Sequence, residues 1–253
     1  MSAEERRRGI LELARDAGSV AVSKLAADFG ISKETIRRDL TVLEEQGLMR
    51  RTHGGAYPVE SAGFETDLAF RAANHVPEKS RIAAAAAALL GNAETVFVDE
   101  GFTPQLIAEA LPQHRPLTVV TPSLGVAREL AAREATTVLL LGGRVRGTTM
   151  ATVDHWTTRM LSGFVIDLAY IGANGISRSH GLTTPDPAVS EVKSQVMRVA
   201  RRRVFAGVHT KFGAVSFCRF AGVSDFEAIV TDTRLRPAEA HRYSLECPQV
   251  LRV

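Results

Sequence analysis

Two adjacent arginines, Arg37 and Arg38, lie in the segment KETIRRDLTVLEEQG and can bind the phosphates and base edges of nucleic acid. Ile36, Leu40 and Leu43 in the same segment recur at the spacing of one helix face. Because a helix turns by about 100° per residue, both arginines point away from that apolar face. The segment therefore predicts a helix that packs on a small core and presents cations outward.

The ends and the acidic residues of this helix leave a second interpretation open. Ser32 is a candidate N-cap and Gly47 a candidate C-cap, so the helix is expected between them. Asp39, Glu44 and Glu45 can neutralise the arginines, and charged helix faces are often only solvated. The neighbouring segments favour a contact with nucleic acid over a solvated face.

The segments before this helix are the ones that would position it on DNA. Residues 4–18 and residues 23–29 both have helical apolar spacing, and Ser23 is a candidate cap of the second helix. Gly30 provides a turn before the third helix. Three short helices with such a turn match the helix-turn-helix plan, in which the last helix enters the major groove.

A basic hairpin is predicted directly after the third helix. Arg50, Arg51 and His53 surround the turn formed by Gly54 and Gly55. Arginines on such a wing suit contacts with phosphates or with the minor groove. We therefore expect a winged helix-turn-helix DNA-binding domain.

The segment VSKLAADFGISKETIRRDLTVLEEQGLMRRTHGGA resembles the DNA-binding signature of the DeoR family of bacterial transcription regulators. That signature combines a T-I-R-R-D-L core, an L-x-x-x-G helix end and an R-x-H-G-G-A wing. A match over some thirty consecutive positions is far more specific than an isolated short motif. The resemblance implies that the following residues lie at or near DNA: Ser32, Lys33, Thr35, Arg37, Arg38, Arg51 and His53.

Composition adds little to this interpretation, because it is that of an ordinary globular protein. The chain has 253 residues, of which 45% are hydrophobic and 23% charged, and its net charge is +3. Residues 1–57 contain 10 Lys and Arg against 9 Asp and Glu, so the cationic footprint is local rather than that of a polycation.

The two cysteines and the longest apolar run predict a cytoplasmic location. Cys218 and Cys247 lack the spacing of a metal site and are expected to be buried free thiols in a reducing compartment. The amino terminus has no apolar leader segment. The run at residues 82–91 is too short to span a membrane and predicts a buried, alanine-rich helix. We expect no membrane association, no metal and no cofactor.

The larger part of the chain alternates between strand-like and helix-like segments. Continuous apolar strands that alternate with helices predict a mainly parallel sheet covered on both faces, which is an α/β domain. The expected domains are the winged helix-turn-helix domain over 1–57, a linker over 58–77 with some helix in 64–73, and the α/β domain over 78–253. Strands are expected at 95–99, 117–121, 136–143, 168–172, 202–208 and 227–232, and helices at 104–110, 123–133 and 188–201.

Polar residues and glycines follow several of these strands, at the edge of the sheet where α/β proteins bind ligands. Hydroxyl groups at helix starts, a glycine pair and a lysine can together hold a phosphate or a carboxylate. The alternative for each residue is a purely structural role as an N-cap or a turn former. The candidates are Asp99, Gly101, Thr103, Thr121, Ser123, Gly142, Gly143 and Lys211.

The resemblance to the DeoR family extends over this half. Its sensor domains resemble sugar-phosphate isomerases of the ribose-5-phosphate isomerase type, with D-x-G-T-T, V-T-N-S, L-G-G, E-x-K and D-S-S-K-F-G at the strand ends. The resemblance implies a phosphorylated sugar as effector, whose binding releases the protein from DNA. It assigns effector contacts to the candidates above and adds Glu191 and Lys193.

Three positions depart from the family pattern. Phe102 replaces a threonine, Pro122 replaces an asparagine, and Val208 replaces an aspartate. The first two replacements remove polar side chains, and Pro122 also lacks an N–H donor. Other residues that can supply polar contacts are His155, Trp156, His180 and His209.

The leading hypothesis is a repressor of carbohydrate metabolism genes that binds operator DNA as a homo-oligomer, a dimer or a tetramer. An activator or a regulator that ignores ligands is an alternative. A sugar-phosphate isomerase or deaminase with a DNA-binding arm is a further alternative, for which Asp99, Glu191 and Lys211 are the candidate proton-transfer groups. Val208 argues against an enzyme, because it removes one carboxylate.

Overall fold

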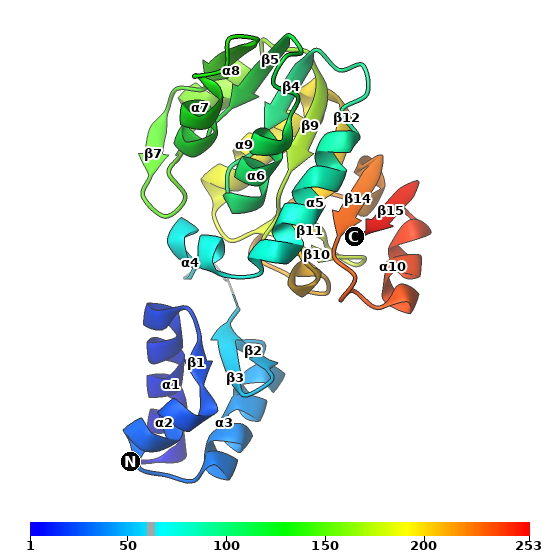
Figure 1. The fold of residues 1–253 in the computed structure, drawn as a ribbon. Coiled ribbons are helices and arrows are strands. Elements are labelled where there is room, and N and C mark those ends of the chain that lie inside the picture. The colour runs from blue at the N-terminus through cyan, green and yellow to red at the C-terminus, as the bar shows by residue number, and fades with distance from the viewer. Residues whose placement is uncertain (60–63) are drawn as a thin grey trace. The chain divides into compact units, whose positions relative to one another are not determined.

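The computed structural model describes residues 1–59 and 64–253. They form two compact units, Met1–Thr66 and Asp67–Val253 (Figure 1). The domain boundaries expected at 57 and 78 stay a prediction, and residues 60–63 of the expected linker lie outside the described residues. In the described ranges, no helix combines the length and the apolar character that crossing a membrane would require.

The first unit is a three-helix core with a small antiparallel sheet, as the sequence predicted. The strand order is β1-β3-β2, and β2 and β3 form the hairpin of the expected wing. Ile10, Leu25, Ile36, Leu40 and Met49 are almost fully buried and form the centre of this unit. The elements are α1 (Ala3–Ala17), β1 (Val20–Ala21), α2 (Val22–Phe29), α3 (Lys33–Glu45), β2 (Met49–Thr52) and β3 (Gly55–Pro58).

Helix ends in this unit follow the sequence with two exceptions, and one of them is the C-cap of α3, which is Gln46 rather than the expected Gly47. Ser32 is the N-cap of α3, and its hydroxyl accepts a hydrogen bond from the backbone N–H of Thr35 at 3.1 Å. Gly30 ends α2 in the left-handed conformation that glycine adopts most easily. The expected cap at Ser23 is wrong, because α2 already begins at Val22 with Ala21 as its N-cap and without a side-chain cap.

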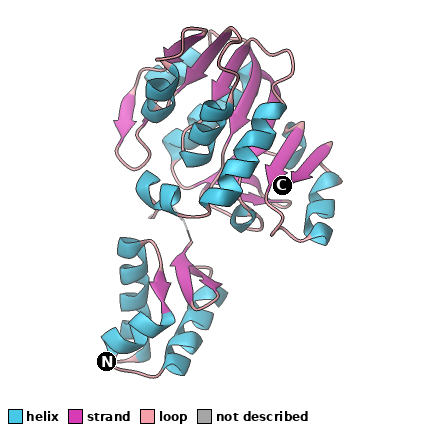
Figure 2. Ribbon diagram, in the orientation of Figure 1, coloured by secondary structure: helices cyan, strands magenta, loops and turns pink. Residues whose placement is uncertain are grey.

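The second unit is built around a parallel seven-stranded sheet, which confirms the predicted α/β class (Figures 1 and 2). The strand order is β15-β14-β12-β9-β4-β5-β6, so the chain winds one way from β4 to β6 and the other way from β9 to β15. The order of winding therefore reverses between β4 and β9. The strands are β4 (Thr95–Val98), β5 (Leu117–Thr121), β6 (Thr136–Leu140), β9 (Ile166–Ile171), β12 (Ala200–Ala206), β14 (Ala228–Thr231) and β15 (Gln249–Arg252).

Each face of this sheet packs into its own hydrophobic cluster, because neighbouring strand residues point to opposite faces. Val96 and Val98 of β4 pack with helices α5, α6 and α7, whereas Phe97 between them packs with α8, α9 and α10. The sheet is thus covered on both faces. These helices are α5 (Val76–Ala88), α6 (Phe102–Ala110), α7 (Leu124–Leu130), α8 (His155–Leu161), α9 (Pro187–Val199) and α10 (Pro237–Ser244).

Several smaller elements were not predicted from the sequence. A three-stranded sheet of order β10-β11-β13 and a hairpin of β7 and β8 lie beside the main sheet, and α8, α10 and β15 were also missed. The short helix α4 (Leu68–Ala73) falls within the expected helical part of the linker. These strands are β7 (Arg144–Arg146), β8 (Ala151–Val153), β10 (Gly175–Ser177), β11 (Gly181–Thr184) and β13 (Cys218–Ala221).

Two further expectations need adjustment. The alanine-rich helix begins at Val76 rather than at 82 and buries only one face, since Arg81 and Ala84 are exposed. Both cysteines are free, but only Cys247 is fully buried, whereas Cys218 on the short strand β13 is half-buried.

Candidate DNA-binding face and ligand edge

The outward face of α3 presents the two arginines that the sequence singled out. Arg37 and Arg38 are both exposed, while Ile36 and Leu40 beside them are buried. Nη1 of Arg37 forms an ion pair with Oε2 of Glu34 at 3.2 Å, where both groups are exposed. Within the part of the chain that the structure describes, Arg38 has no hydrogen-bond or ion-pair partner. Its guanidinium therefore keeps all its donors available.

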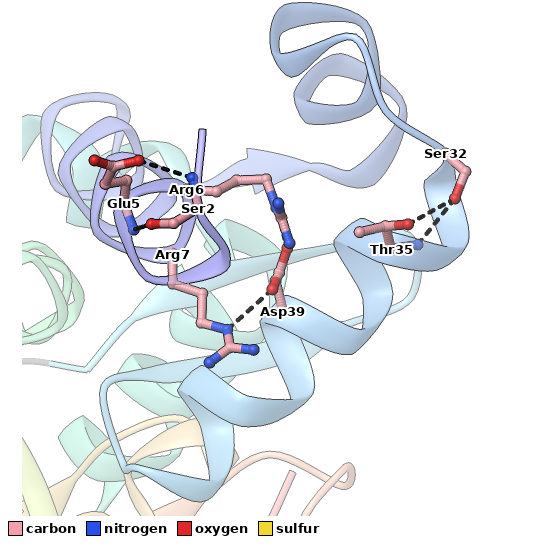
Figure 3. Close-up of polar contacts among 7 residues, drawn as sticks. All are labelled: Ser2, Glu5, Arg6, Arg7, Ser32, Thr35 and Asp39. Carbon is pink, nitrogen blue, oxygen red and sulfur yellow. Dashed lines mark hydrogen bonds and ion pairs between the residues drawn. The ribbon is translucent and has the colours of Figure 1, made fainter.

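The first turn of α3 adds hydroxyl groups to this face. The hydroxyls of Ser32 and Thr35 lie 2.9 Å apart and form a hydrogen bond, as Figure 3 shows. Ser32 and Lys33 are exposed, so the start of the helix offers an ammonium group and polar donors together. This arrangement is suited to phosphate contacts at the entry of a recognition helix.

The wing is tied to α3 by Arg51. Its backbone N–H donates to Oε1 of Glu44 at 3.0 Å, and its Nη1 donates to the hydroxyl of Thr41 at 3.0 Å. His53 is exposed at the turn. Gly55 must be glycine, because a Cβ there would lie 2.2 Å from the carbonyl oxygen of Val20. The wing therefore has a defined place beside the recognition helix.

Asp39 corrects the sequence interpretation. From the sequence it is expected with Glu44 and Glu45 on the solvated side of α3, but its side chain is only 2% exposed. Its two carboxylate oxygens accept hydrogen bonds from Nε of Arg6 at 2.6 Å and from Nε of Arg7 at 2.9 Å (Figure 3). The rotation of 100° per residue places Asp39 closer to Ile36 and Leu43 than to the outward face, and this signal was available in the sequence.

In the second unit, a buried ion pair lies where the sheet reverses its winding. Nζ of Lys193 on α9 donates to the carboxylate of Asp99, which follows β4, and to the carbonyl oxygen of Gly172, which follows β9, at 3.1 Å. The backbone N–H of Gly172 donates to Asp99 at 2.9 Å. The side chains of Lys193 and Asp99 are each 3% exposed or less. Ligands of open α/β sheets bind at this reversal point.

Gly101 and Thr103 border this ion pair at the start of α6. Gly101 is the N-cap of α6 with φ of 110°, a conformation that glycine adopts without strain. Thr103 lies in the first turn of α6, where backbone N–H groups have no helical partner. Between them, the ring of Phe102 packs under Nζ of Lys79, 5.5 Å from the ring centre. Nζ of Lys79 donates to the carbonyl oxygens of Arg71 and Asn74, so the ring of Phe102 borders a cation that backbone groups hold.

The candidates that follow β5 and β6 have structural partners. The hydroxyl of Thr121 accepts a hydrogen bond from the N–H of Ser123 at 3.1 Å, and the Ser123 hydroxyl caps α7. The carbonyl oxygen of Gly142 accepts a hydrogen bond from the hydroxyl of Thr157 at 2.7 Å. A Cβ at Gly143 would lie 2.3 Å from that hydroxyl. These four residues shape the turns at the edge, and their role in effector binding stays a prediction.

At the other side of the edge, His209 and Asp232 form a pair that the sequence analysis did not identify. Asp232 directly follows β14, and it accepts from the backbone N–H of His209 at 2.8 Å and pairs with Nδ1 at 2.9 Å. Burial raises the pKa of Asp232, but the hydrogen bonds from His209 outweigh burial and lower this pKa to about 2. Asp232 is therefore a fixed anion that orients the imidazole. Lys211 lies two residues further along the same short helical turn.

Comparison with known proteins supports the domains that the geometry suggests. The sequence matches the DeoR-like helix-turn-helix domain over residues 6–62 and the DeoR C-terminal sensor domain over residues 74–233. The chain belongs to the DeoR family. Its relatives include the glycerol-3-phosphate regulon repressor of Escherichia coli (strain K12), which is 34% identical over 232 residues, 92% of either chain.

A second relative of this DeoR-family chain is the HTH-type transcriptional regulator GlpR of Haloferax volcanii. It is 35% identical over 231 residues, which are 91% of this chain and 90% of that one. Among solved structures, ribose 5-phosphate isomerase A from Neisseria gonorrhoeae is similar over 54% of this chain and 53% of its own, with a TM-score of 0.39 and 16% identity. The predicted function, a DNA-binding transcription regulator, is thus confirmed.

The departures from the DeoR pattern have local structural consequences. Val208 is 3% exposed and packs into the core, so the carboxylate expected there is absent from the edge. Asp232 supplies a carboxylate from the neighbouring strand instead. The carbonyl oxygen of Pro122 accepts a hydrogen bond from the N–H of Thr152 at 2.9 Å. Asp232 directly follows an apolar strand, as Asp99 does, so the same pattern in the sequence would have selected it.

The candidates are too widely spread for one small effector to contact all of them. Lys211 follows β12 and Gly142 follows β6, which are four strand positions apart in the sheet. At about 4.8 Å per position, the two ends are roughly 19 Å apart. Of the candidates, Lys193 and Asp99 are in contact, whereas Lys211 follows a strand two positions away from β4, and their role in effector binding stays a prediction.

Proposed function

We propose that this chain represses carbohydrate metabolism genes and leaves its operator when a small phosphorylated sugar binds to the edge of the sensor sheet. The observation that carries the proposal is the buried pair of Lys193 and Asp99 where the winding reverses between β4 and β9. A buried ammonium held by a carboxylate offers an incoming anionic ligand a cation whose position is already set.

Three lysines at the edge can attract an anionic ligand, although Asp99 and Asp232 place carboxylates there too. Lys79 lies over Phe102, Lys193 lies below the reversal point, and Lys211 lies after β12. The first turn of α6 adds backbone N–H donors, which favour negative charge at a helix start. The relative in Escherichia coli is named a repressor of the glycerol-3-phosphate regulon, which is consistent with a phosphorylated ligand here.

The operator must first be obtained experimentally. A duplex that is enriched from a random pool by repeated binding to the full-length protein serves as the probe. Fluorescence anisotropy then measures release of this duplex by triose, pentose and hexose phosphates, with the matching free sugars and inorganic phosphate beside them. Release by a sugar phosphate, but not by its free sugar, supports the proposal. Continued binding in the presence of every compound would indicate a regulator that ignores these ligands.

The variant Lys211→Ala tests the site. It should lose release by the sugar phosphate while its affinity for the duplex stays unchanged, because Lys211 belongs to the sensor unit. Arg242→Ala is the matched control, since it removes one positive charge from an exposed position on α10. If Lys211→Ala releases the duplex at the same effector concentration as Arg242→Ala, the residue is not an effector contact.

Two further parts of the proposal have simple tests. We expect no turnover of sugar phosphates, because relatives that match about nine tenths of the chain are named as a repressor and a transcriptional regulator. Isomerised or deaminated product in a reaction with pure protein would favour the enzyme. We also expect that the protein acts in the cytoplasm. It should be a dimer or a tetramer, since one recognition helix reads only a few base pairs. Light scattering of the pure protein gives the assembly directly.

A further inference from the structure

A second pair of arginines lies beside the recognition helix, on a different element from the first. Arg6 and Arg7 belong to the first two turns of α1, and both bind Asp39 of α3 through Nε. Thus one buried carboxylate holds two guanidinium groups, as Figure 3 shows. The hydrogen bond between Arg6 and Asp39 raises the pKa of Arg6, so this side chain stays positively charged.

The arginines of the wing and those of α1 lie on opposite flanks of α3. Arg51 reaches α3 at Thr41, whereas Arg6 and Arg7 reach it at Asp39. At about 100° per residue, Thr41 and Asp39 are separated by roughly 160° around the helix. The exposed residue Arg38 lies between them on the outward side.

The hydrogen bonds of Arg7 leave its outer nitrogens available. Only Nε of Arg7 bonds to Asp39, and Figure 3 draws no dashed line to either of its Nη atoms. In the described residues, neither Nη atom has a hydrogen-bond partner. The side chain of Arg7 is 32% exposed, whereas that of Arg6 is 12% exposed. Arg7 therefore presents donors to the surroundings, and Arg6 contributes mainly to holding Asp39.

A helix in the major groove has a phosphate backbone on either side, because the groove is about 12 Å wide. The wing supplies a cation on one flank of α3. We propose that Arg7 binds a DNA phosphate on the opposite flank, where Asp39 holds its guanidinium in place. The recognition helix is then clamped between two phosphate contacts from different elements. This proposal rests on the DNA-binding function of the chain.

The test compares two variants of neighbouring arginines on α1. Arg7→Gln removes the proposed contact, and Arg8→Gln is the matched control, because Arg8 is exposed and does not contact Asp39. Affinity of the full-length protein is measured by anisotropy for the enriched duplex and for a duplex of random sequence, at several salt concentrations. A phosphate contact contributes about 0.9 to the slope of log K against log salt.

For Arg7→Gln we expect weaker binding to both duplexes and a salt slope that is smaller by about 1. Arg8→Gln should keep the wild-type slope. The variant Arg7→Lys retains the charge and should keep most of the slope, which separates a phosphate contact from a role in packing alone. Thermal unfolding confirms that each variant is folded.

An unchanged slope in Arg7→Gln, with or without a loss of affinity, would overturn the phosphate contact and leave Arg7 a structural role. Failure of the DNA-binding function is recognised separately, because then the wild type and Arg8→Gln would also fail to bind either duplex.

Discussion

Lys193 joins Asp99 and Gly172, so a single buried ammonium group links the ends of β4 and β9. Removal of one partner from a buried ion pair leaves the other charge without compensation, which typically costs about 3–5 kcal/mol. We therefore expect Lys193→Met to lower the free energy of unfolding of the chain by about this amount. Urea unfolding at neutral pH, followed by circular dichroism, measures the change.

The double variant Lys193→Met with Asp99→Asn is the control for this prediction. It removes both charges, so it should recover a large part of the lost stability. If the single variant unfolds within about 0.5 kcal/mol of the wild type, as exposed substitutions do, the pair has no structural importance.

Arg38→Ala should weaken binding of the enriched duplex by about 1–3 kcal/mol and relax specificity at one base position. The reason is that Arg38 is exposed on the outward face of α3 and has no partner in the described residues. Anisotropy with the enriched duplex and with single-base variants of it measures the effect. Arg51→Ala on the wing should instead weaken all duplexes about equally. A loss in Arg38→Ala that is uniform across sequences would assign this residue to a phosphate.

The main sheet was predictable because strands buried on both faces are continuous apolar runs. Leu117–Thr121 has the bounds that were expected, and it pairs with a strand on either side. By contrast, Gln249–Arg252 was missed because its four residues contain only two apolar ones, and its pairing with β14 defines it. The other edge strand, β6, also lacks a fully buried residue but was predicted from its apolar run. Short strands such as Gly181–Thr184 depend, as β15 does, on partners distant in sequence.

The candidate site was predictable where a residue type and its place in the chain were sufficient. Asp99 was found by its position after an apolar strand. The partnership of His209 with Asp232 was missed because it depends on β12 and β14 being neighbours, which the sequence does not state. The helical rotation already places Asp39 near the apolar face, and only its partners Arg6 and Arg7 depend on how α1 packs.

Asp39→Asn should weaken binding of DNA even though it makes the chain more positive. General electrostatics alone would strengthen the binding, since a negative charge is removed. The loss follows because an amide holds the two guanidinium groups of α1 less strongly than a carboxylate does. Asp28→Asn, at an exposed position on α2, is the control with the same change in charge. Equal affinity of the two variants, both folded by circular dichroism, would show that Asp39 does not position the DNA-binding face.

We expect the free energy of unfolding to depend on pH through the titration of His75. This residue is the N-cap of α5 and has φ of 55°. Burial lowers the pKa of His75 from 6.5, and the charge of the adjacent His209 lowers it further. Glu78 opposes this shift in pKa, while Lys79 and Arg234 add to it. The unfolded chain therefore binds the proton more strongly than the folded chain does. The contribution of neutral His75 to the free energy of unfolding is therefore complete above pH 6.5. It is lost as the pH falls from 6.5 through the lowered pKa of the folded chain.

His75→Asn isolates this contribution. Asparagine tolerates the left-handed backbone at this position but does not titrate. Urea unfolding between pH 7 and about pH 5 should show a flatter profile for the variant than for the wild type. Asp232 does not confuse the comparison, because hydrogen bonds from His209 outweigh the effect of burial and keep its pKa at about 2, below this range. Profiles that superimpose would mean that His75 takes up a proton equally in both states.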